Sequence, residues 1–496
     1  MKKYDLVVVG SGAGLTVLEA ALQQGLKCAM VERSKFGGTC LTKGCIPSKM
    51  LVYPADLIRE AQSSGRIGMT FQPPQVDWAQ IARRMWGQIG HSEGIRKSLK
   101  NVPGLDVYEG TAEFAGPRRM LVRDESGESS EEFTASAFVL AAGARSFVPP
   151  VEGLEQAGYV TAESFFGEKF PQTPWKSLII VGGGAIGAEF AHIFSAFGAK
   201  VTLVEMQDRI LPTEEEEISA FVRAQFEKNG IVVHTGSKAV SAARDGSLKA
   251  LTVETSTTGA RETISAEEIF IASGVRSNGD LLKVDAAGIA TDAKGWIAVN
   301  EYLETNQKGI FALGDINGKF QFRHKANYEA SVLIGNLFGG EKRAVSYDAV
   351  PWAVFTWPQV AHVGLTEREA REKGLKIGVA RNHYSSVAAG ISMGYSTGSD
   401  DDGFAKLILT PDMRIVGAHV VGPYAAMLVQ PFVYLIHAGC PCQALSALAP
   451  AKARRRLNEE CPELGSVMPV ADSMVIHPSM NELVAWAIDN VQWDEH

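Results

Sequence analysis

The 496-residue sequence has few cysteines, no long apolar run and no excess of positive charge. Six cysteines are too few for a disulfide framework in so long a chain. No apolar run approaches the length of a bilayer span, and the N-terminal residues lack the features of a secretion signal. With 48 Lys and Arg against 56 Asp and Glu, the net charge of -8 gives no reason to expect a nucleic-acid partner. We therefore expect a cytoplasmic protein of about three domains that binds neither nucleic acid nor membrane.

What the chain does contain is a glycine-rich turn between a predicted strand at 4–9 and a predicted helix at 15–24. A second strand, 27–31, ends at Glu32, about 20 residues after the first glycine, where an acid can bind a ribose hydroxyl. Glycines let the main chain approach a pyrophosphate, and the helix N-terminus supplies unpaired N–H groups. Leu15 stands where a third motif glycine is expected, so we expect the helix to tilt or to pack further from the strand. The glycines of this turn are Gly10, Gly12 and Gly14.

The same unit occurs again, with a strand at 177–181, a helix at 188–197 and a strand at 201–204 that ends at Glu205. Its motif glycines are Gly182, Gly184 and Gly187. One such turn can be an ordinary strand–helix connection, but two complete units predict two bound dinucleotides. No Arg follows Glu205 to hold a 2′-phosphate, and its carboxylate would repel one. The second unit is therefore predicted to prefer NAD over NADP.

Cys40 and Cys45 are the one close cysteine pair near the N-terminus. On an ideal helix their Cα atoms would be about 8.6 Å apart, whereas a disulfide tolerates at most about 6.8 Å. The segment must therefore be irregular when oxidised, which Gly44 permits. Pro47 suits a first helical turn, so Cys45 should lie near a helix N-terminus that, with Lys49 close by, stabilises a thiolate. The alternatives are two unpaired buried thiols or zinc ligands, but zinc would need two more Cys or His with suitable spacing, and we predict no metal.

The segment from Gly37 to Lys49, GGTCLTKGCIPSK, resembles the redox-disulfide signature of the flavin-dependent pyridine nucleotide-disulfide oxidoreductases, and most closely its dihydrolipoamide dehydrogenase branch. Residues 141–143, 314–315 and 477–482 resemble that family as well. The resemblance implies an α/β fold with two Rossmann-like domains, for FAD and NAD, and a C-terminal α+β dimerisation domain that forms a homodimer. The expected domains are 1–150 (FAD-binding, first part), 151–272 (NAD-binding), 273–346 (return to the FAD-binding domain) and 347–496 (interface).

The resemblance also implies catalytic roles. Cys45 would face the flavin, and Cys40 would form a mixed disulfide with the substrate. Lys49 would lie beside the flavin, paired with Glu189. His477 would be the base contributed by the partner subunit, oriented by Glu482 and followed by a cis bond to Pro478. A capping box formed by Ser479 and Glu482 is the alternative explanation for that last segment.

Cofactor contacts follow from the two turns and the resemblance together. The expected FAD contacts are Gly10, Gly12, Gly14, Glu32, Thr39, Lys49, Gly143 and Asp315. The expected NAD contacts are Gly182, Gly184, Gly187, Glu189, Glu205 and Gly274. For Asp315 the alternative is a helix N-cap after a turn.

The function implied is transfer of electrons from dihydrolipoyl groups, free or on a carrier protein, through the Cys40–Cys45 disulfide and FAD to NAD. A glutathione-type reductase is disfavoured because Glu19-Ala20-Ala21 stands where such enzymes place arginine. A mercuric reductase would be expected to end in a vicinal cysteine pair, which this chain lacks, although Cys440 and Cys442 keep a thiol-rich variant open. A redox-inactive flavoprotein that serves as a binding component is the alternative from another class.

The stretch from 440 to 470 is longer than the family usually has. It holds Cys440, Cys442, Cys461 and a basic run of Lys452, Arg454, Arg455 and Arg456. The basic run could contact an acidic carrier domain, and a solvated loop is at least as good an explanation.

Overall fold

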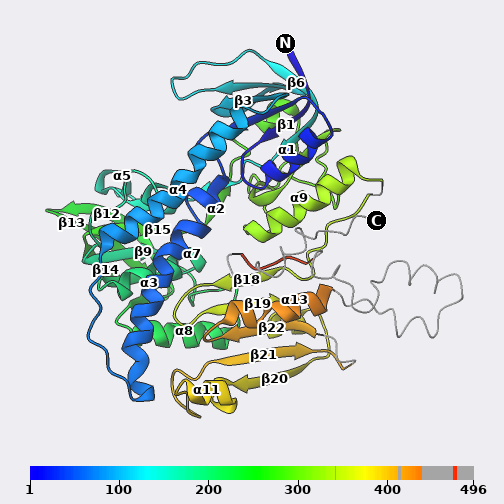
Figure 1. The fold of residues 1–496 in the computed structure, drawn as a ribbon. Helices are drawn as coiled ribbons and strands as arrows, with labels where there is room; N and C mark the ends of the chain where they lie inside the picture. Colours follow the sequence, from blue (N-terminus) through cyan, green and yellow to red (C-terminus); the bar gives the residue numbers. More distant parts are fainter. Residues whose placement is uncertain (341, 412–414, 438–472, 478–496) are drawn as a thin grey trace, which may run out of the picture. The chain divides into compact units, whose positions relative to one another are not determined.

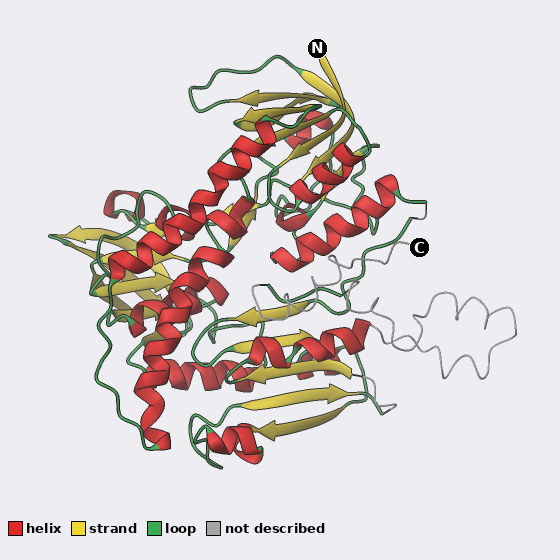
Figure 2. Cartoon of the chain, viewed as in Figure 1, coloured by secondary structure: helices red, strands yellow, loops and turns green. Residues whose placement is uncertain are grey.

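A computed structural model describes residues 1–340, 342–411, 415–437 and 473–477 (Figure 1, Figure 2). The chain divides into two compact units. The first consists of Met1–Gln62, Phe71–Leu211 and Phe226–Val345, and the second of Ser63–Thr70, Pro212–Gln225 and the described part of Ser346–His496. Within the described ranges, none of the helices combines the length and the apolar character that crossing a membrane requires.

The first sheet of the first unit carries the first glycine turn. Its strands lie in the order β3-β2-β1-β6-β5-β4, and β17 pairs with β6. The central strand β1 is buried from Leu6 to Val9, because a parallel strand covered on both faces requires a continuous apolar run. The strands are β1 (Lys2–Val9), β2 (Cys28–Glu32), β3 (Leu105–Glu109), β4 (Thr111–Gly116), β5 (Arg119–Arg123), β6 (Phe133–Leu140) and β17 (Ile310–Ala312).

Helices α1 and α9 pack against each other beside this sheet (Figure 1). Their apolar residues form one core with Leu6, Val8 and Met30 of β1 and β2. The helices of this unit beside the sheet are α1 (Gly14–Gln23), α2 (Gly38–Thr42), α3 (Cys45–Ser63), α4 (Trp78–Lys100) and α9 (Arg323–Phe338), with 3-10 turns η2 (Val284–Ala287) and η3 (Gly314–Asn317). The 3-10 turn η1 (Ser64–Ile67) belongs to the second unit.

The second glycine turn follows the middle strand of a five-stranded parallel sheet in the order β11-β10-β9-β15-β8. Its strands are β8 (Val160–Thr161), β9 (Ser177–Val181), β10 (Lys200–Val204), β11 (Val232–His234) and β15 (Glu268–Ile271). An antiparallel sheet of β12 (Ser237–Asp245), β13 (Leu248–Thr255) and β14 (Arg261–Ala266) packs beside it, and β7 (Ala144–Ser146) pairs with β16 (Val275–Ser277). The helices here are α5 (Leu154–Ala157), α6 (Ala162–Phe165) and α7 (Ala185–Ala196), while most of α8 (Glu216–Lys228) belongs to the second unit.

The second unit is built on a five-stranded antiparallel sheet in the order β18-β19-β22-β21-β20. Its strands are β18 (Pro351–Val354), β19 (Val360–Gly364), β20 (Gly378–His383), β21 (Phe404–Leu409) and β22 (Ile415–Val421). Its helices are α10 (Glu367–Glu372), α11 (Ala388–Ser392), α12 (Ala425–Leu428) and α13 (Gln430–His437), with the 3-10 turn η4 (Tyr384–Ser386). The expected α/β architecture with a third, α+β part is confirmed.

The element boundaries show where local turn chemistry overrides apolar patterning. The strand predicted at 177–181 is confirmed. Apolar residues at 353–356 and 404–409 also predict strands; the second is β21, whereas β18 ends at Val354. The Thr356 hydroxyl donates a hydrogen bond to the carbonyl of Pro358 at 2.6 Å, so this residue belongs to the turn that follows.

Candidate functional site

The backbone of the first glycine turn leaves no room for a Cβ atom at two of its glycines. Gly10 has φ of +100°, and a Cβ there would lie 2.3 Å from the carbonyl oxygen of Ala141. A Cβ on Gly14 would lie 2.7 Å from the side chain of Val8, so this glycine permits the close contact of α1 with β1. No side chain of the described residues caps the N-terminus of α1, so its first N–H groups can face a phosphate.

The Leu15 substitution is accommodated by moving the close helix–strand contact to Gly14. In the second turn, a Cβ on Gly187 would lie 1.8 Å from the carbonyl oxygen of Gly182, so that position requires glycine. Leu15, at the corresponding place in the first turn, is half-buried, and α1 begins one residue before it. The phosphate-facing turn is therefore retained without the third glycine.

Glu32 lies at the end of β2 directly beside this turn. It is 9% exposed, and one carboxylate oxygen accepts hydrogen bonds from the Ser11 N–H at 2.9 Å and the Ser11 hydroxyl at 2.6 Å. The other oxygen accepts from the Ser34 N–H at 2.9 Å. That second oxygen also accepts from the Ser34 hydroxyl, but at 3.4 Å, so this weak contact is the one that a ribose hydroxyl can replace.

The predicted redox segment packs directly on the first turn. A Cβ on Gly38 would lie 2.6 Å from the Cα of Gly12, so the two backbones meet at a distance that only glycine allows. Cys40 lies in α2, and Cys45 is the first residue of the 19-residue helix α3. The predicted break at Gly44 is confirmed, and the two cysteine sulfurs lie within 4.8 Å of each other.

Cys28 provides a contrast to this pair. It is fully buried in β2. Burial raises the pKa of its thiol to about 11, and the nearby Asp5 adds to the effect. Since the thiolate is the reactive form, Cys28 is a packing residue rather than a redox group.

Helix α3 is joined to helix α7 of the second glycine unit by three polar pairs. Lys49 Nζ lies 2.9 and 2.7 Å from the two carboxylate oxygens of Glu189, which is the predicted pairing. The sequence did not predict the other two, His192 Nε2 with Asp56 at 2.8 Å and the Arg59 guanidinium with the Ser195 hydroxyl at 2.7 Å. The redox helix is thus fixed to the helix that begins at the second turn.

Asp315 lies inside the turn η3 and does not cap it, since the N-cap residue is Leu313. Burial raises the pKa of the Asp315 carboxyl to about 6, against the attraction of Lys325. The alternative reading as an N-cap is therefore wrong, and Asp315 is a partly desolvated acid held at the end of β17.

A fully buried ion pair holds η3 in place. Lys325 Nζ donates to the carbonyl of Gly314 at 3.0 Å and to Asn317 Oδ1 at 2.6 Å, and lies 3.0 Å from Glu329. Glu329 in turn accepts from the Gly314 N–H at 2.7 Å and from the Asn317 amide at 2.9 Å. This pair was not predicted from the sequence, where the spacing of one helical turn between Lys325 and Glu329 is the signal that could have indicated it.

The second glycine turn repeats the geometry of the first. Gly182 has φ of +112°, and a Cβ there would lie 2.3 Å from the carbonyl oxygen of Ala272. Gly184 is the N-cap of α7, and no side-chain cap is found among the described residues. Glu205 is 7% exposed and accepts hydrogen bonds from the Gly183 N–H at 2.6 Å and the Gln207 N–H at 2.8 Å.

The remaining predicted site residues lie in loops and short elements. Gly143 follows β6 with φ of +67°, and Gly274 follows β15 with φ of +101°. Thr39 lies in α2, where its carbonyl accepts from the N–H of Lys43 at 2.8 Å. His477 is half-buried in the second unit. Pro478, Glu482 and the 440–470 stretch lie outside the described residues, so the cis bond, the capping box and the basic run stay predictions.

Comparisons with known proteins agree with this geometry. The family model for pyridine nucleotide-disulphide oxidoreductases matches residues 4–330, and the model for the dimerisation domain of the same family matches residues 350–451. Mycothione reductase of Mycobacterium tuberculosis (strain ATCC 25618 / H37Rv) is 34% identical over 479 residues, which cover 94% of this chain and 98% of the relative. Dihydrolipoyl dehydrogenase 3 of Haloarcula marismortui is 32% identical, over 89% of this chain and 92% of the relative.

Solved structures agree as well. The Cu(II) complex of the HOCl-induced flavoprotein disulfide reductase RclA from Escherichia coli aligns with a TM-score of 0.78 and 25% identity, over 99% of this chain and 100% of that chain. One family assignment fits all of these observations. They are the two glycine turns with their acids, the cysteine pair packed on the first turn, and the sequence matches along almost the whole chain. The chain belongs to the pyridine nucleotide-disulphide oxidoreductase family.

Proposed function

We propose that the protein is a flavin-dependent oxidoreductase that exchanges electrons between a nicotinamide nucleotide and a small dithiol or disulfide through Cys40 and Cys45. The observation that carries this proposal is the position of the cysteine pair. Its sulfurs lie within 4.8 Å of each other, and its segment contacts the first glycine turn between Gly38 and Gly12. A redox pair fixed to a dinucleotide-binding turn is suited to passing electrons to a bound flavin.

The chain's residues give the two cysteines different roles. Cys45 begins α3, where the partial positive charge of the helix N-terminus stabilises a thiolate. Cys40 lies in a separate short helix, so it can move against Cys45 when the bond between them opens. We assign Cys45 to the flavin side and Cys40 to the mixed disulfide with substrate.

The residues of the first turn fit FAD. The turn has no room for a side chain at Gly10, and Gly38 packs on Gly12 too closely for one. The N-terminus of α1 has no side-chain cap from the described residues, and Glu32 is held beside the turn where it can accept a ribose hydroxyl. Asp315 would hold a hydroxyl on the flavin side of the cofactor. When bound, FAD supplies two-electron transfer between nicotinamide and a disulfide. Gly14, Thr39, Lys49 and Gly143 complete the proposed FAD contacts.

The second turn fits a nicotinamide nucleotide for the same reasons, and we propose NAD. Glu205 presents a buried carboxylate that two backbone N–H groups orient. A carboxylate accepts hydrogen bonds from a ribose diol, whereas it repels a 2′-phosphate. Gly182, Gly184, Gly187, Glu189 and Gly274 complete the proposed NAD contacts.

For the substrate we propose a dihydrolipoyl group, free or on a carrier protein, as the sequence resemblance implies. The similarity to a mycothione reductase supports a second candidate, the disulfide of a low-molecular-weight thiol. In both cases His477, oriented by Glu482 and contributed across a homodimer, would take the proton from the substrate thiol. The dimerisation-domain match supports that assembly.

Anaerobic titration of the purified, FAD-loaded protein with NADH tests the redox proposal. The reduced protein is expected to develop a long-wavelength absorbance from a thiolate beside the flavin. Cys45→Ser should abolish this absorbance, Cys40→Ser should retain it, and Cys28→Ala is the matched cysteine control that should leave it unchanged. If the absorbance survives in Cys45→Ser, the assigned cysteine roles are wrong.

The substrate is tested separately by steady-state assays. Dihydrolipoamide, mycothiol disulfide, glutathione disulfide and mercuric ion are compared, each with NAD(H) and NADP(H). We expect the highest kcat/KM with dihydrolipoamide and NAD. A preference of tenfold or more for mycothiol disulfide would replace the lipoyl assignment and leave the redox proposal intact.

A further inference from the structure

A second cluster of chemically reactive side chains lies in the second unit, entirely among its own residues. Glu214 precedes α8, His362 lies in β19 and His419 lies in the neighbouring strand β22, directly opposite His362 in the ladder. The ligand-type atoms of the three side chains all lie within 4.8 Å of one another. The two imidazole rings stack with centroids 5.3 Å apart.

The cluster is largely buried, so its polar atoms need hydrogen-bond or metal partners within the protein. Glu214 and His419 are 1% and 0% exposed, and His362 is half-buried. Glu214 Oε2 lies 2.8 Å from His362 Nδ1, but Glu214 Oε1 and His419 Nδ1 have no hydrogen-bond partner in the described parts of the chain. Buried polar atoms without partners are rare, and an unlocated ion is one of the standard reasons for them.

The hydrogen bond on the far side of His419 fixes its protonation. Nε2 lies 2.9 Å from the carbonyl oxygen of Leu365, and because a carbonyl can only accept, Nε2 carries the hydrogen. Nδ1 of the neutral ring therefore carries a lone pair, and no described residue donates to it. A histidine whose second nitrogen donates to a backbone carbonyl is the usual arrangement of a metal ligand.

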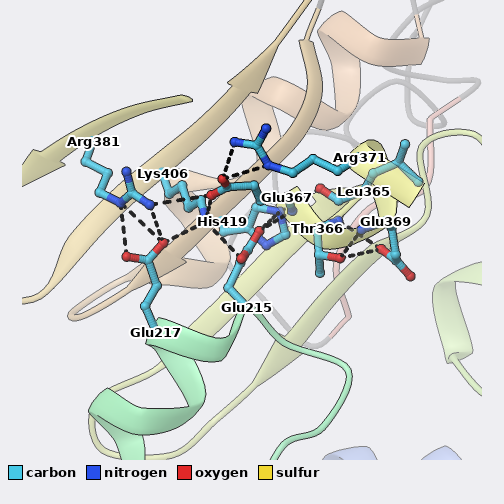
Figure 3. Close-up of polar contacts among 10 residues, drawn as sticks. All are labelled: Glu215, Glu217, Leu365, Thr366, Glu367, Glu369, Arg371, Arg381, Lys406 and His419. Atoms are coloured by element: carbon cyan, nitrogen blue, oxygen red, sulfur yellow. Dashed lines mark hydrogen bonds and ion pairs between the residues drawn. The ribbon is translucent and has the colours of Figure 1, made fainter. Parts of the chain in front are cut away.

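The charged groups around the cluster are largely paired with one another. Glu215 Oε1 lies 3.8 Å from His419 Nε2, on the side of the ring that faces Leu365 (Figure 3). The nearby Lys406 is 2% exposed and is already shared by three carboxylates, those of Glu215, Glu217 and Glu367, at 2.8, 2.6 and 2.9 Å. Arg371 pairs with Glu367 and Arg381 with Glu217, so three cations match these three carboxylates. The carboxylate left to attract a further positive charge is that of Glu214, which contacts only the imidazole of His362 among the described residues.

A proton accounts for only part of this arrangement. One proton between His362 and Glu214 explains their 2.8 Å contact, but it leaves Glu214 Oε1 and His419 Nδ1 unsatisfied. A metal ion with bonds of about 2.0–2.2 Å to nitrogen and oxygen would place tetrahedral ligands about 3.4 Å apart. The cluster reaches that spacing if the 2.8 Å contact between His362 and Glu214 opens by roughly 0.6 Å and the wider separations close.

We propose that Glu214, His362 and His419 form a binding site for a divalent transition-metal ion, with zinc as the best fit. Two imidazoles and one carboxylate suit zinc, whereas magnesium and calcium prefer oxygen ligands throughout. The ion would link the segment that leads into α8 to two strands of the sheet, so its role is to stabilise this unit. The site is distinct from the cysteine pair, and it adds a metal to a chain for which the sequence predicted none.

Zinc binding by the full-length FAD-loaded protein tests the proposal. Wild type and variants are dialysed against a small molar excess of Zn²⁺, and bound zinc is counted by atomic emission. His419→Gln removes the Nδ1 ligand, while its amide nitrogen can still donate to the carbonyl of Leu365. His362→Asn likewise keeps a donor toward Glu214, and His91→Gln, at an exposed histidine of α4, is the matched control.

We expect His419→Gln and His362→Asn each to bind one zinc fewer per chain than wild type, and His91→Gln to bind the same number. Zinc should raise the unfolding midpoint of wild type and of His91→Gln, but not that of the two cluster variants. X-ray absorption of the zinc ion that wild type binds and the cluster variants lack should show nitrogen and oxygen ligands at about 2.0–2.1 Å rather than sulfur at about 2.3 Å.

Equal zinc content in wild type and both cluster variants would overturn the proposal. Sulfur ligands on the zinc ion that wild type binds and the cluster variants do not bind would overturn it as well. Unfolding midpoints measured without zinc show whether each variant is folded. Because His362 is half-buried, His362→Asn keeps the test decisive if His419→Gln does not fold.

Discussion

Glu205 is predicted to set the nucleotide preference, and Glu205→Gln is the sharpest perturbation of it. The carboxylate is 7% exposed, and each oxygen accepts one backbone hydrogen bond, from Gly183 at 2.6 Å and from Gln207 at 2.8 Å. Two lone pairs remain for a ribose diol. Glutamine has nearly the same shape, but it has no charge, and its single oxygen can satisfy only one of the two N–H groups.

The expected magnitude follows from these contacts. A hydrogen bond to a charged group contributes about 1.5–3 kcal/mol, and every ~1.4 kcal/mol is a factor of ten. Losing the charge should therefore lower kcat/KM for NADH about 10- to 100-fold. A 2′-phosphate about 4 Å from the carboxylate would be repelled by roughly 4 kcal/mol per pair of unit charges before solvent screening. The same substitution should therefore leave kcat/KM for NADPH unchanged or raise it, so that the preference for NADH falls by at least tenfold.

Steady-state kinetics with both nucleotides measure this preference, and Glu32→Gln is the matched control. Glu32 has the same position and the same two-oxygen pattern in the first unit, with contacts to Ser11 and Ser34. We expect Glu32→Gln to weaken FAD retention without changing the NADH to NADPH ratio. Equal kcat/KM of the wild-type protein for NADPH and NADH would refute the reasoning. An unchanged ratio of kcat/KM for NADH to that for NADPH in Glu205→Gln would also refute it.

Two further perturbations concern buried charges. Lys325→Met leaves the fully buried Glu329 without its cation, so we expect the unfolding free energy to fall by about 3–5 kcal/mol and FAD retention to weaken. Adding Glu329→Gln to this variant should restore part of the stability. Denaturant unfolding measures the stability, and flavin release measures the FAD retention. Hydrogen bonds from Arg371 and then Lys406 lower the pKa of Glu367 to about 2. A pKa lowered by folding contributes stability that is complete above the unfolded value near 4.3 and disappears as pH falls toward about 2. Lys406→Met should therefore shift the acid-unfolding midpoint to higher pH, and an unchanged midpoint would contradict the assigned network.

The sequence by itself determined the features that depend on short segments. The two glycine turns, the acids Glu32 and Glu205 and the break between Cys40 and Cys45 all follow from local rules: strand length, glycine conformation and helix geometry. These features lie within about 35 residues of each other in each unit, so the chain's own spacing places them. The Lys49–Glu189 contact joins distant segments and came only through the resemblance to a family.

Only the tertiary structure decided which distant polar side chains share a buried site. Glu214 and His362 are 148 positions apart, and each alone looks like an ordinary surface acid or an isolated histidine in an apolar strand. Strand pairing between β19 and β22 brings His362 opposite His419, and the segment before α8 supplies the carboxylate. A single-residue shift in register would turn one imidazole to the other face of the sheet. Since that register is set by packing of the whole sheet, no local pattern in the sequence could reveal the cluster.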